Sequence, residues 1–154
     1  MENFIRSSSS YTRIVLHISF KVKYCHRVFD NPKFRNRCEE IFKKAEKDTG
    51  IAVQECGFAG DHVHMVWHIL PKQSISEIAK IFKGRSGWFL LKEFPEIKKQ
   101  FFWSSGLWAG TIYADSLGKN PEGMRNYVRK QGGPKISPNQ TQLSKFMPPV
   151  SDRW

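Results

Sequence analysis

Hydrophobic and polar residues alternate along two stretches of the chain, and this period of two predicts β-strands over residues 13–23 and 63–69. The first stretch carries its apolar side chains at Ile14, Leu16, Ile18, Phe20 and Val22. The second carries them at Val63, Met65, Trp67 and Ile69. Because successive side chains of a strand point to opposite faces, the polar side of the second strand carries three histidines, His62, His64 and His68.

Apolar residues at helical spacing, combined with capping signals, predict three helices. The first begins at Asn31, an N-cap followed by proline, and ends at Gly50. The second begins at a capping box formed by Ser74 and Glu77. The third is short and covers about residues 121–131.

Further strands predicted over residues 51–59 and 109–115 complete the order strand, helix, strand, strand, helix, strand, helix. This interleaved order predicts an α+β fold, in which a four-stranded antiparallel sheet has two helices on one face. The opposite face, which presents the histidines, is expected to be open. Residues 1–132 are predicted to form one domain, with residues 1–11 as a loose N-terminal lead-in and residues 133–154 as a C-terminal tail.

The charge of the chain points to a polyanionic partner. The formal net charge of +11 favours nucleic acid, although a merely basic soluble protein is the alternative. Positive charge continues past the first strand and occurs again in the sequence KGRSG at residues 83–87. The two glycines of this segment indicate either a break in the helix or the close approach of another backbone or a phosphate to the helix. The candidate DNA contacts are Lys21, Lys23, Tyr24, Arg27, Lys83 and Arg85.

The composition also indicates the cellular compartment in which the protein is expected. No apolar run approaches the roughly 18 residues that a membrane helix needs, and no secretory signal is expected. The three cysteines show no CxxC spacing, which favours reduced thiols in a cytoplasmic protein.

His62 and His64 form a candidate metal clamp. Two imidazoles at positions i and i+2 lie on one side of a strand, roughly 6–7 Å apart at the backbone, so they can share one ion if a third ligand comes from elsewhere. An antiparallel neighbouring strand would bring His17 close to them. The carboxylate of Asp61 could orient an imidazole, although a plain turn aspartate is the alternative.

Tyr127 and Gln131 lie one turn apart on the predicted third helix. A tyrosine hydroxyl attacks a phosphodiester when a divalent metal neutralises the phosphate. The glutamine could supply a carbonyl oxygen as the third metal ligand, which would give a mixed site suited to Mg²⁺, Mn²⁺ or Zn²⁺. A tyrosine that is simply packed in the core is the alternative.

Five sequence segments together resemble the IS200/IS605 family of single-tyrosine transposases, which belongs to the HUH (His–hydrophobe–His) endonucleases. They are HISFKVKY, FAGDHVHMVW, SISEIAKIFKGRSGWFLLKEFPEIKK, LWAGTIYADS and YVRKQ, and they span about residues 14–131. The resemblance implies an RRM-like (ferredoxin-like) fold and a metal-dependent DNA transposase.

The same resemblance implies the roles of individual residues. Tyr127 would attack a phosphate of single-stranded DNA at the end of an insertion element, without ATP, and form a 5′-phosphotyrosine bond. His62, His64 and Gln131 would hold Mg²⁺ or Mn²⁺. The DNA would carry hairpins, and the enzyme would work as a homodimer in which the tyrosine helix of one chain serves the histidines of the other.

Three alternatives remain open at the level of sequence. A related HUH nickase acting on palindromic repeats or replication origins would share the same residues. A non-catalytic RRM-like nucleic-acid-binding module would be expected to carry stacking aromatic residues on its open sheet face. A structural zinc site would combine Cys56 with His62 and His64.

Overall fold

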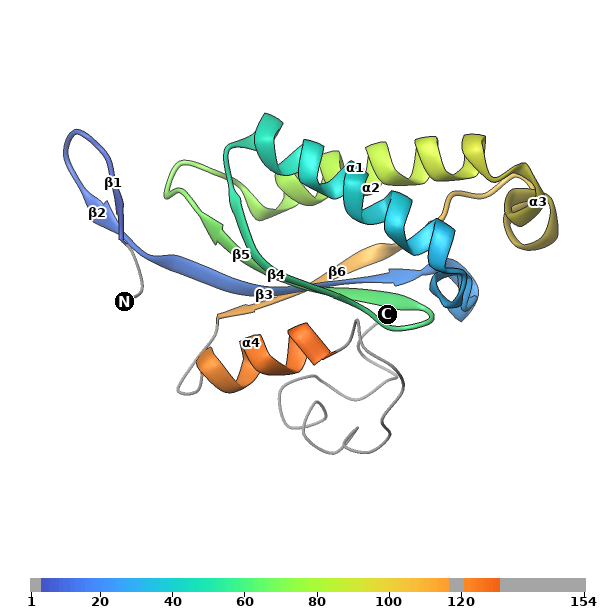
Figure 1. Ribbon diagram of the computed structural model, residues 1–154. Helices are drawn as coiled ribbons and strands as arrows, with labels where there is room; N and C mark the ends of the chain where they lie inside the picture. The colour runs from blue at the N-terminus through green and yellow to red at the C-terminus, as the bar shows by residue number, and fades with distance from the viewer. Residues whose placement is uncertain (1–3, 117–120, 131–154) are drawn as a thin grey trace.

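The computed structural model describes residues 4–116 and 121–130, and its centre is a four-stranded antiparallel sheet (Figure 1). The strands are β3 (Ile14–Val22), β4 (Ala52–Phe58), β5 (His62–Ile69) and β6 (Trp108–Ser116). Their order across the sheet is β4-β5-β3-β6. This arrangement confirms the predicted α+β fold with its four-stranded antiparallel sheet. The predicted C-terminal tail lies outside the described residues.

Two long helices cover one face of the sheet, as predicted (Figure 1). Helix α1 (Pro32–Thr49) begins where the Asn31 side chain accepts hydrogen bonds from two backbone N–H groups of the first turn, and it ends at Gly50 with a φ of 75°. Helix α2 (Ile75–Glu93) begins where the Ser74 hydroxyl accepts from the backbone N–H of Glu77, 3.4 Å away. Both helix starts therefore follow directly from the local sequence.

Helix α2 is continuous through its two glycines, so the helix break considered for residues 83–87 is wrong. A Cβ atom at Gly87 would lie 3.7 Å from Trp108 of β6, which shows that the helix packs closely on the sheet at this point. Each glycine costs about 1 kcal/mol of helix propensity relative to alanine. Packing of the helix against the sheet outweighs that cost.

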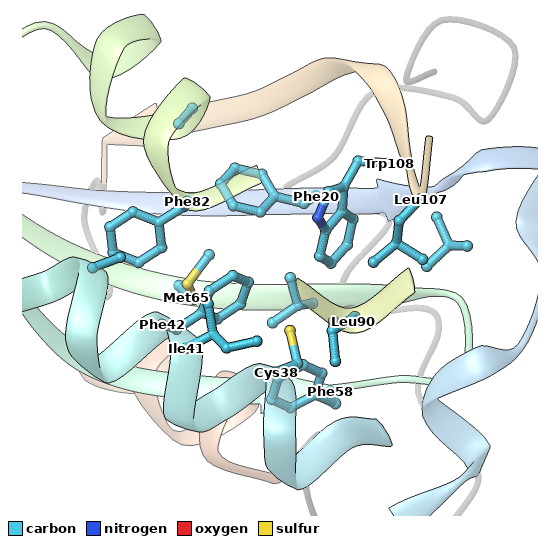
Figure 2. Packing of buried hydrophobic residues seen from close by; sticks show 14 of the residues in the cluster. Phe20, Cys38, Ile41, Phe42, Phe58, Met65, Phe82, Leu90, Leu107 and Trp108 are labelled. Atoms are coloured by element: carbon cyan, nitrogen blue, oxygen red, sulfur yellow. The ribbon is translucent and has the colours of Figure 1, made fainter. Parts of the chain in front are cut away.

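The main core lies between the sheet and the two long helices (Figure 2). The ring of Phe20 contacts those of Phe42, Trp67 and Trp108 edge to face, with centroids 5.6–6.2 Å apart. Full burial of one such side chain contributes about 1.5–3 kcal/mol. Alternating apolar residues of β3 and β5 therefore contribute to the stability on this side of the sheet, together with buried residues of the two helices.

Two local features differ from the sequence predictions. The N-terminal stretch, predicted to be loose, forms a small hairpin in which β1 (Ile5–Arg6) pairs with β2 (Tyr11–Thr12). Serine residues make its turn, and the backbone N–H of Ser7 donates to the carbonyl of Ser10 over 2.8 Å. Between α2 and β6 lie the unpredicted helix α3 (Pro95–Ile97) and a π-helical turn.

Helix α4 (Pro121–Lys130) lies on the other side of the sheet, so the expectation of an open histidine face is wrong (Figure 1). Val128 of α4 is fully buried against Val66 of β5, and Val15 and Tyr127 pack around this pair. The physical reason is that the polar faces of β3 and β5 each include one valine. These two valines form an apolar spot on which the helix docks.

Over the part of the chain that the structure describes, none of the helices combines the length and the apolar character needed to cross a membrane.

Candidate active site

His62 and His64 lie side by side on β5, on the face of the sheet that α4 covers. Their ring centroids are 4.5 Å apart and the rings stand almost perpendicular, at 88°. His64 is fully buried and His62 is partly buried. The strand alternation thus brings the two imidazoles together on one face, as the sequence predicts.

Asp61 orients His62. The tight turn between β4 and β5 is closed by the backbone N–H of Ala59, which donates to the carbonyl of His62 over 2.9 Å. The turn places Oδ1 of Asp61 2.6 Å from Nδ1 of His62. Burial raises the pKa of the Asp61 carboxyl, but the hydrogen bond from His62 and the charges of His62 and Lys21 outweigh it and hold that pKa below its usual range. An ionised carboxylate only accepts, so His62 donates from Nδ1.

His17 occupies the equivalent position beside His64. Nε2 of His17 lies 2.9 Å from Nδ1 of His64, and the two rings are nearly parallel, with centroids 5.1 Å apart. His17 comes from the central strand β3, directly across from Val66. Burial lowers the pKa of His17 to about 4, against the attraction of Asp115 and with a further lowering from His62. His17 is therefore neutral at pH 7.

Tyr127 faces the histidines from α4. Its ring meets that of His64 edge to face, with centroids 5.9 Å apart. Two contacts hold the helix in this place: Val128 is buried on the sheet, and the Arg129 guanidinium forms an ion pair with Glu55 of β4. The predicted nucleophile and the predicted metal clamp thus meet within one chain.

Two of the three predicted metal ligands lie within the described residues, whereas Gln131, the predicted third ligand, lies outside them. Among residues 4–116 and 121–130, no three His, Cys, Asp or Glu side chains cluster closely enough to hold a metal ion. His68 lies four positions along β5 from His64 and does not complete such a group. A metal site at the histidine pair would therefore require a ligand of another type or from the rest of the chain.

The zinc alternative is wrong for a reason of topology. Cys56 pairs with Met65 across β4 and β5, and cross-strand partners share a face of the sheet. Cys56 therefore packs against the main core, on the side opposite His62 and His64. Burial raises the pKa of its thiol, which disfavours the thiolate that zinc binds.

The predicted DNA contacts near the first strand lie at its C-terminal end or in the turns that follow it. Lys21 pairs with His62 across the strands, so it shares the histidine face. Lys23 and Tyr24 follow in a 3₁₀ turn, where Tyr24 is 66 % exposed and has a left-handed φ of 62°. Arg27 forms an ion pair with Asp30 over 2.9 Å. Their role in DNA binding remains a prediction.

Lys83 and Arg85 lie on α2, so the sheet separates them from the histidine pair (Figure 1). The Lys83 ammonium donates to the carbonyl of Ala109 over 2.6 Å, at the outer edge of β6. The Arg85 guanidinium forms an ion pair with Asp48 of α1. The structure thus does not bring these two residues to the site, and a DNA contact through them would be on the helical side.

Sequence reasoning missed two residues that complete the surroundings of the histidines. Asp115 and Tyr113 of β6 pair with His17 and Ser19 of β3, and the Tyr113 ring lies 5.6 Å from that of His17. The strand pattern of residues 109–115 was visible in the sequence. The pairing register that places these side chains beside His17 depends on contacts between distant strands, so no local signal reveals it.

Comparison with known protein families gives a match over most of the chain. Residues 10–131 match the family described as "Transposase IS200 like". The transposase for insertion sequence element IS200 of Salmonella typhimurium is 30% identical over 119 residues, which cover 75% of this chain and 74% of that protein. The ISDra2 transposase TnpA of Deinococcus radiodurans is 24% identical over 116 residues, which cover 75% of this chain and 81% of that protein.

Solved structures show the same fold. A crystal structure from Deinococcus radiodurans R1, assigned to a transposase, superposes with a TM-score of 0.69 at 18% identity, covering 84% of this chain and 99% of that one. A REP-associated tyrosine transposase, solved bound to a REP hairpin, superposes with a TM-score of 0.57 at 10% identity, covering 83% of this chain and 70% of that one.

Proposed function

The chain belongs to the family of IS200-like transposases, and from this premise we propose that it nicks and rejoins single-stranded DNA through a covalent bond to Tyr127. The observation that carries the proposal is the meeting of three side chains under α4. The Tyr127 ring lies 5.9 Å from that of His64, which lies 4.5 Å from that of His62. A nucleophile beside a pair of metal-binding side chains is the arrangement that phosphoryl transfer requires.

The proposed step exchanges one phosphate ester for another. The Oη atom of Tyr127 attacks a DNA phosphorus and loses its proton, while the bond from phosphorus to the 3′-oxygen breaks. The 3′-oxygen leaves and takes up a proton, which gives a free 3′-hydroxyl and a 5′-phosphotyrosine. Attack by another 3′-hydroxyl reverses the step and joins two strands. Because one ester bond is made for each one broken, ATP is not required.

His62 and His64 fit a divalent cation, Mg²⁺ or Mn²⁺, with Gln131 proposed as the third ligand. The Nδ1 atoms of both rings are engaged, by Asp61 at 2.6 Å and by His17 at 2.9 Å, so Nε2 is the nitrogen of each ring that would bind the ion. When bound, the cation would neutralise the phosphate and polarise its bond to the leaving oxygen. Tyr127, with a reference pKa near 10, needs this help at neutral pH.

The DNA partner is proposed to be single-stranded with hairpins near the ends of an insertion element. The net charge of +11 and the position of Lys21 on the histidine face support a negatively charged ligand there. The REP-associated relative is bound to a hairpin, and we extend that ligand class to this chain. A homodimer in which Tyr127 serves the partner's histidines remains a prediction. Restoration of cleavage on mixing Tyr127→Phe with His64→Ala would support it.

The alternative of a non-catalytic RRM-like module is less well supported. Such a module would use an open sheet face for base stacking. Here α4 covers that face with Val128, and the face carries buried histidines in place of exposed aromatic rings.

The test uses labelled single-stranded DNA from the ends of the chain's own element, with Mg²⁺ or Mn²⁺. We expect a protein–DNA adduct that survives denaturation and that is abolished by EDTA and by Tyr127→Phe. The matched control is Tyr113→Phe, which removes a hydroxyl from the second tyrosine on the same face of the sheet and should retain the adduct. Adduct that persists in Tyr127→Phe would identify a different nucleophile, and binding without cleavage in any protein would favour the non-catalytic module.

A further inference from the structure

We propose that His17 is a positioning residue for the metal site: it accepts a hydrogen bond from Nδ1 of His64 and so holds His64 in the tautomer that binds metal through Nε2. This inference rests on the proposed function, because it concerns the same site. It gives a role to a residue of β3 for which the family resemblance implies none.

The contact between the two rings is short and fully enclosed. The two nitrogens are 2.9 Å apart and the rings are nearly parallel, with an angle of 18° between their planes. His17 is 1% exposed and His64 is 0% exposed. Water therefore does not compete for the hydrogen bond, and the partner that each ring meets decides where its proton lies.

A hydrogen bond between two neutral imidazoles has only two arrangements, and they differ in their consequence for metal binding. If His17 donated from Nε2, Nδ1 of His64 would accept and its proton would sit on Nε2, which then could not ligate an ion. If His64 donates from Nδ1, its Nε2 carries the lone pair that a metal needs. Only the second arrangement allows His64 to act together with His62.

The surroundings of His17 favour its role as a neutral acceptor. Asp115 of β6 is its cross-strand partner, the Tyr113 ring lies 5.6 Å away, and His64 faces it from β5. When His17 accepts at Nε2, its own proton must sit on Nδ1. Among the described residues, Nδ1 of His17 has no hydrogen-bond partner, so no acceptor or donor there opposes this tautomer.

Each of the two proposed metal-binding histidines thus donates a hydrogen bond from Nδ1 to an acceptor, and the two acceptors differ in their chemistry. His62 lies at the partly exposed end of the clamp, and a carboxylate, Asp61, holds it. His64 lies at the closed end, where a second carboxylate would place an unpaired negative charge in the interior at a high cost. An imidazole can accept the same hydrogen bond without a charge, which suits the buried position.

The tautomer is tested first, on the full-length protein without metal. Histidine-selective ¹⁵N labelling and two-bond ¹⁵N–¹H correlation spectra distinguish a protonated Nδ1 from a protonated Nε2. We expect His64 to carry its proton on Nδ1, and His64→Gln identifies its signals by their loss. A His64 protonated on Nε2 would overturn the inference whatever the metal affinity proves to be.

The metal affinity is tested next, by calorimetric titration of Mn²⁺ into the full-length protein without DNA. Loss of a group that supports a metal ligand typically weakens binding about 10–100-fold, and we expect this for His17→Leu. His17→Gln should recover most of the affinity, because its amide oxygen can accept the same hydrogen bond. The matched control is His68→Leu, which removes another buried histidine from the same face and should bind Mn²⁺ as the wild type does.

The outcomes separate this inference from the function on which it rests. Wild-type affinity in both His17 variants, with a folded protein, would overturn the role of His17 and leave the metal site intact. Absence of Mn²⁺ binding by the wild type would overturn the metal site, and the role of His17 with it. Weak binding by His17→Leu together with recovery in His17→Gln would support the inference.

Discussion

The two faces of the sheet are both buried, but they are built from different chemistry. On the helical face, β3 and β5 contribute Phe20, Met65 and Trp67 to a core of interlocking rings. On the other face the same two strands contribute buried polar residues, among them His17 and His64, under a single short helix. One strand pair therefore contributes to the packed core on one side and carries the candidate chemistry on the other.

The difference in hydrogen bonding shows that the histidine face is not optimised for stability. Within the described residues, Ser19 Oγ and His68 Nε2 are buried polar atoms that have no hydrogen-bond partner. Each such group costs about 1–3 kcal/mol relative to a satisfied one. Among the side chains that the structure describes in the helical core, none has a buried polar atom that lacks a partner in this way. Retention of costly polar groups on one face is typical of functional sites.

The largest change in the free energy of unfolding is expected from a substitution on the helical face. Phe20→Ala removes a fully buried ring that touches Trp67 and Trp108, and we expect it to lower the free energy of unfolding by about 3–5 kcal/mol. Urea unfolding followed by tryptophan fluorescence measures the change. A loss below about 1 kcal/mol would show that the aromatic cluster is not the main stabilising core.

The second effect is a pH dependence of stability that comes from the buried imidazole of His17. Its pKa falls from 6.5 in the unfolded chain to about 4 in the folded protein, so the unfolded chain takes up the proton first as the pH falls. Stability from this group is complete above pH 6.5 and is lost between pH 6.5 and 4, by about 3 kcal/mol in total.

Lowering the pH from 7 to 4 should therefore reduce the free energy of unfolding more in the wild type than in His17→Gln, which has no titrating group at this position. The comparison between the two proteins removes the general effect of acid on a basic chain. The lowered pKa of Asp61 acts outside this window, because its contribution is lost only below its ordinary value of 3.8. Parallel pH profiles for the two proteins would contradict the predicted burial of neutral His17.

A third substitution, Val128→Ala, distinguishes the docking of α4 from global folding. Val128→Ala removes two methyl groups from the contact with Val66, which should weaken docking by roughly 1–2 kcal/mol. We expect adduct formation through Tyr127 to fall about tenfold, while the midpoint of global unfolding stays close to that of the wild type. An unchanged rate of adduct formation would mean that this docked position of α4 is not the one used in the reaction.

The smallest effect is expected at the rim of the histidine face. The ion pair between Arg129 and Glu55 is largely exposed on the arginine side, where salt screens it. Glu55→Gln should change the rate of adduct formation by no more than about twofold, and the difference should vanish at high salt. A large effect that persists in high salt would indicate that Glu55 has a direct role in the site.

Local sequence patterns predicted the strands and the helix ends, which depend on residues close together in the chain. The features that sequence reasoning missed depend on contacts between distant parts of the chain. Alternation revealed β3 and β5 and placed His62 and His64 together, while Asn31 and Gly50 marked both ends of α1. Docking of α4 escaped prediction, because the valines on the histidine face belong to different strands and become a patch only in the folded sheet. The register of β6, which brings Asp115 to His17, was hidden for the same reason.

Mass spectrometry of the adduct would show directly whether Tyr127 is the residue joined to DNA. Trypsin should release Tyr127 in the peptide of residues 126–129, because arginines at 125 and 129 flank it. We predict that the DNA fragment is attached to this peptide through its 5′-phosphate. Attachment to another peptide, or a free 5′-phosphate with no protein attached, would contradict the account.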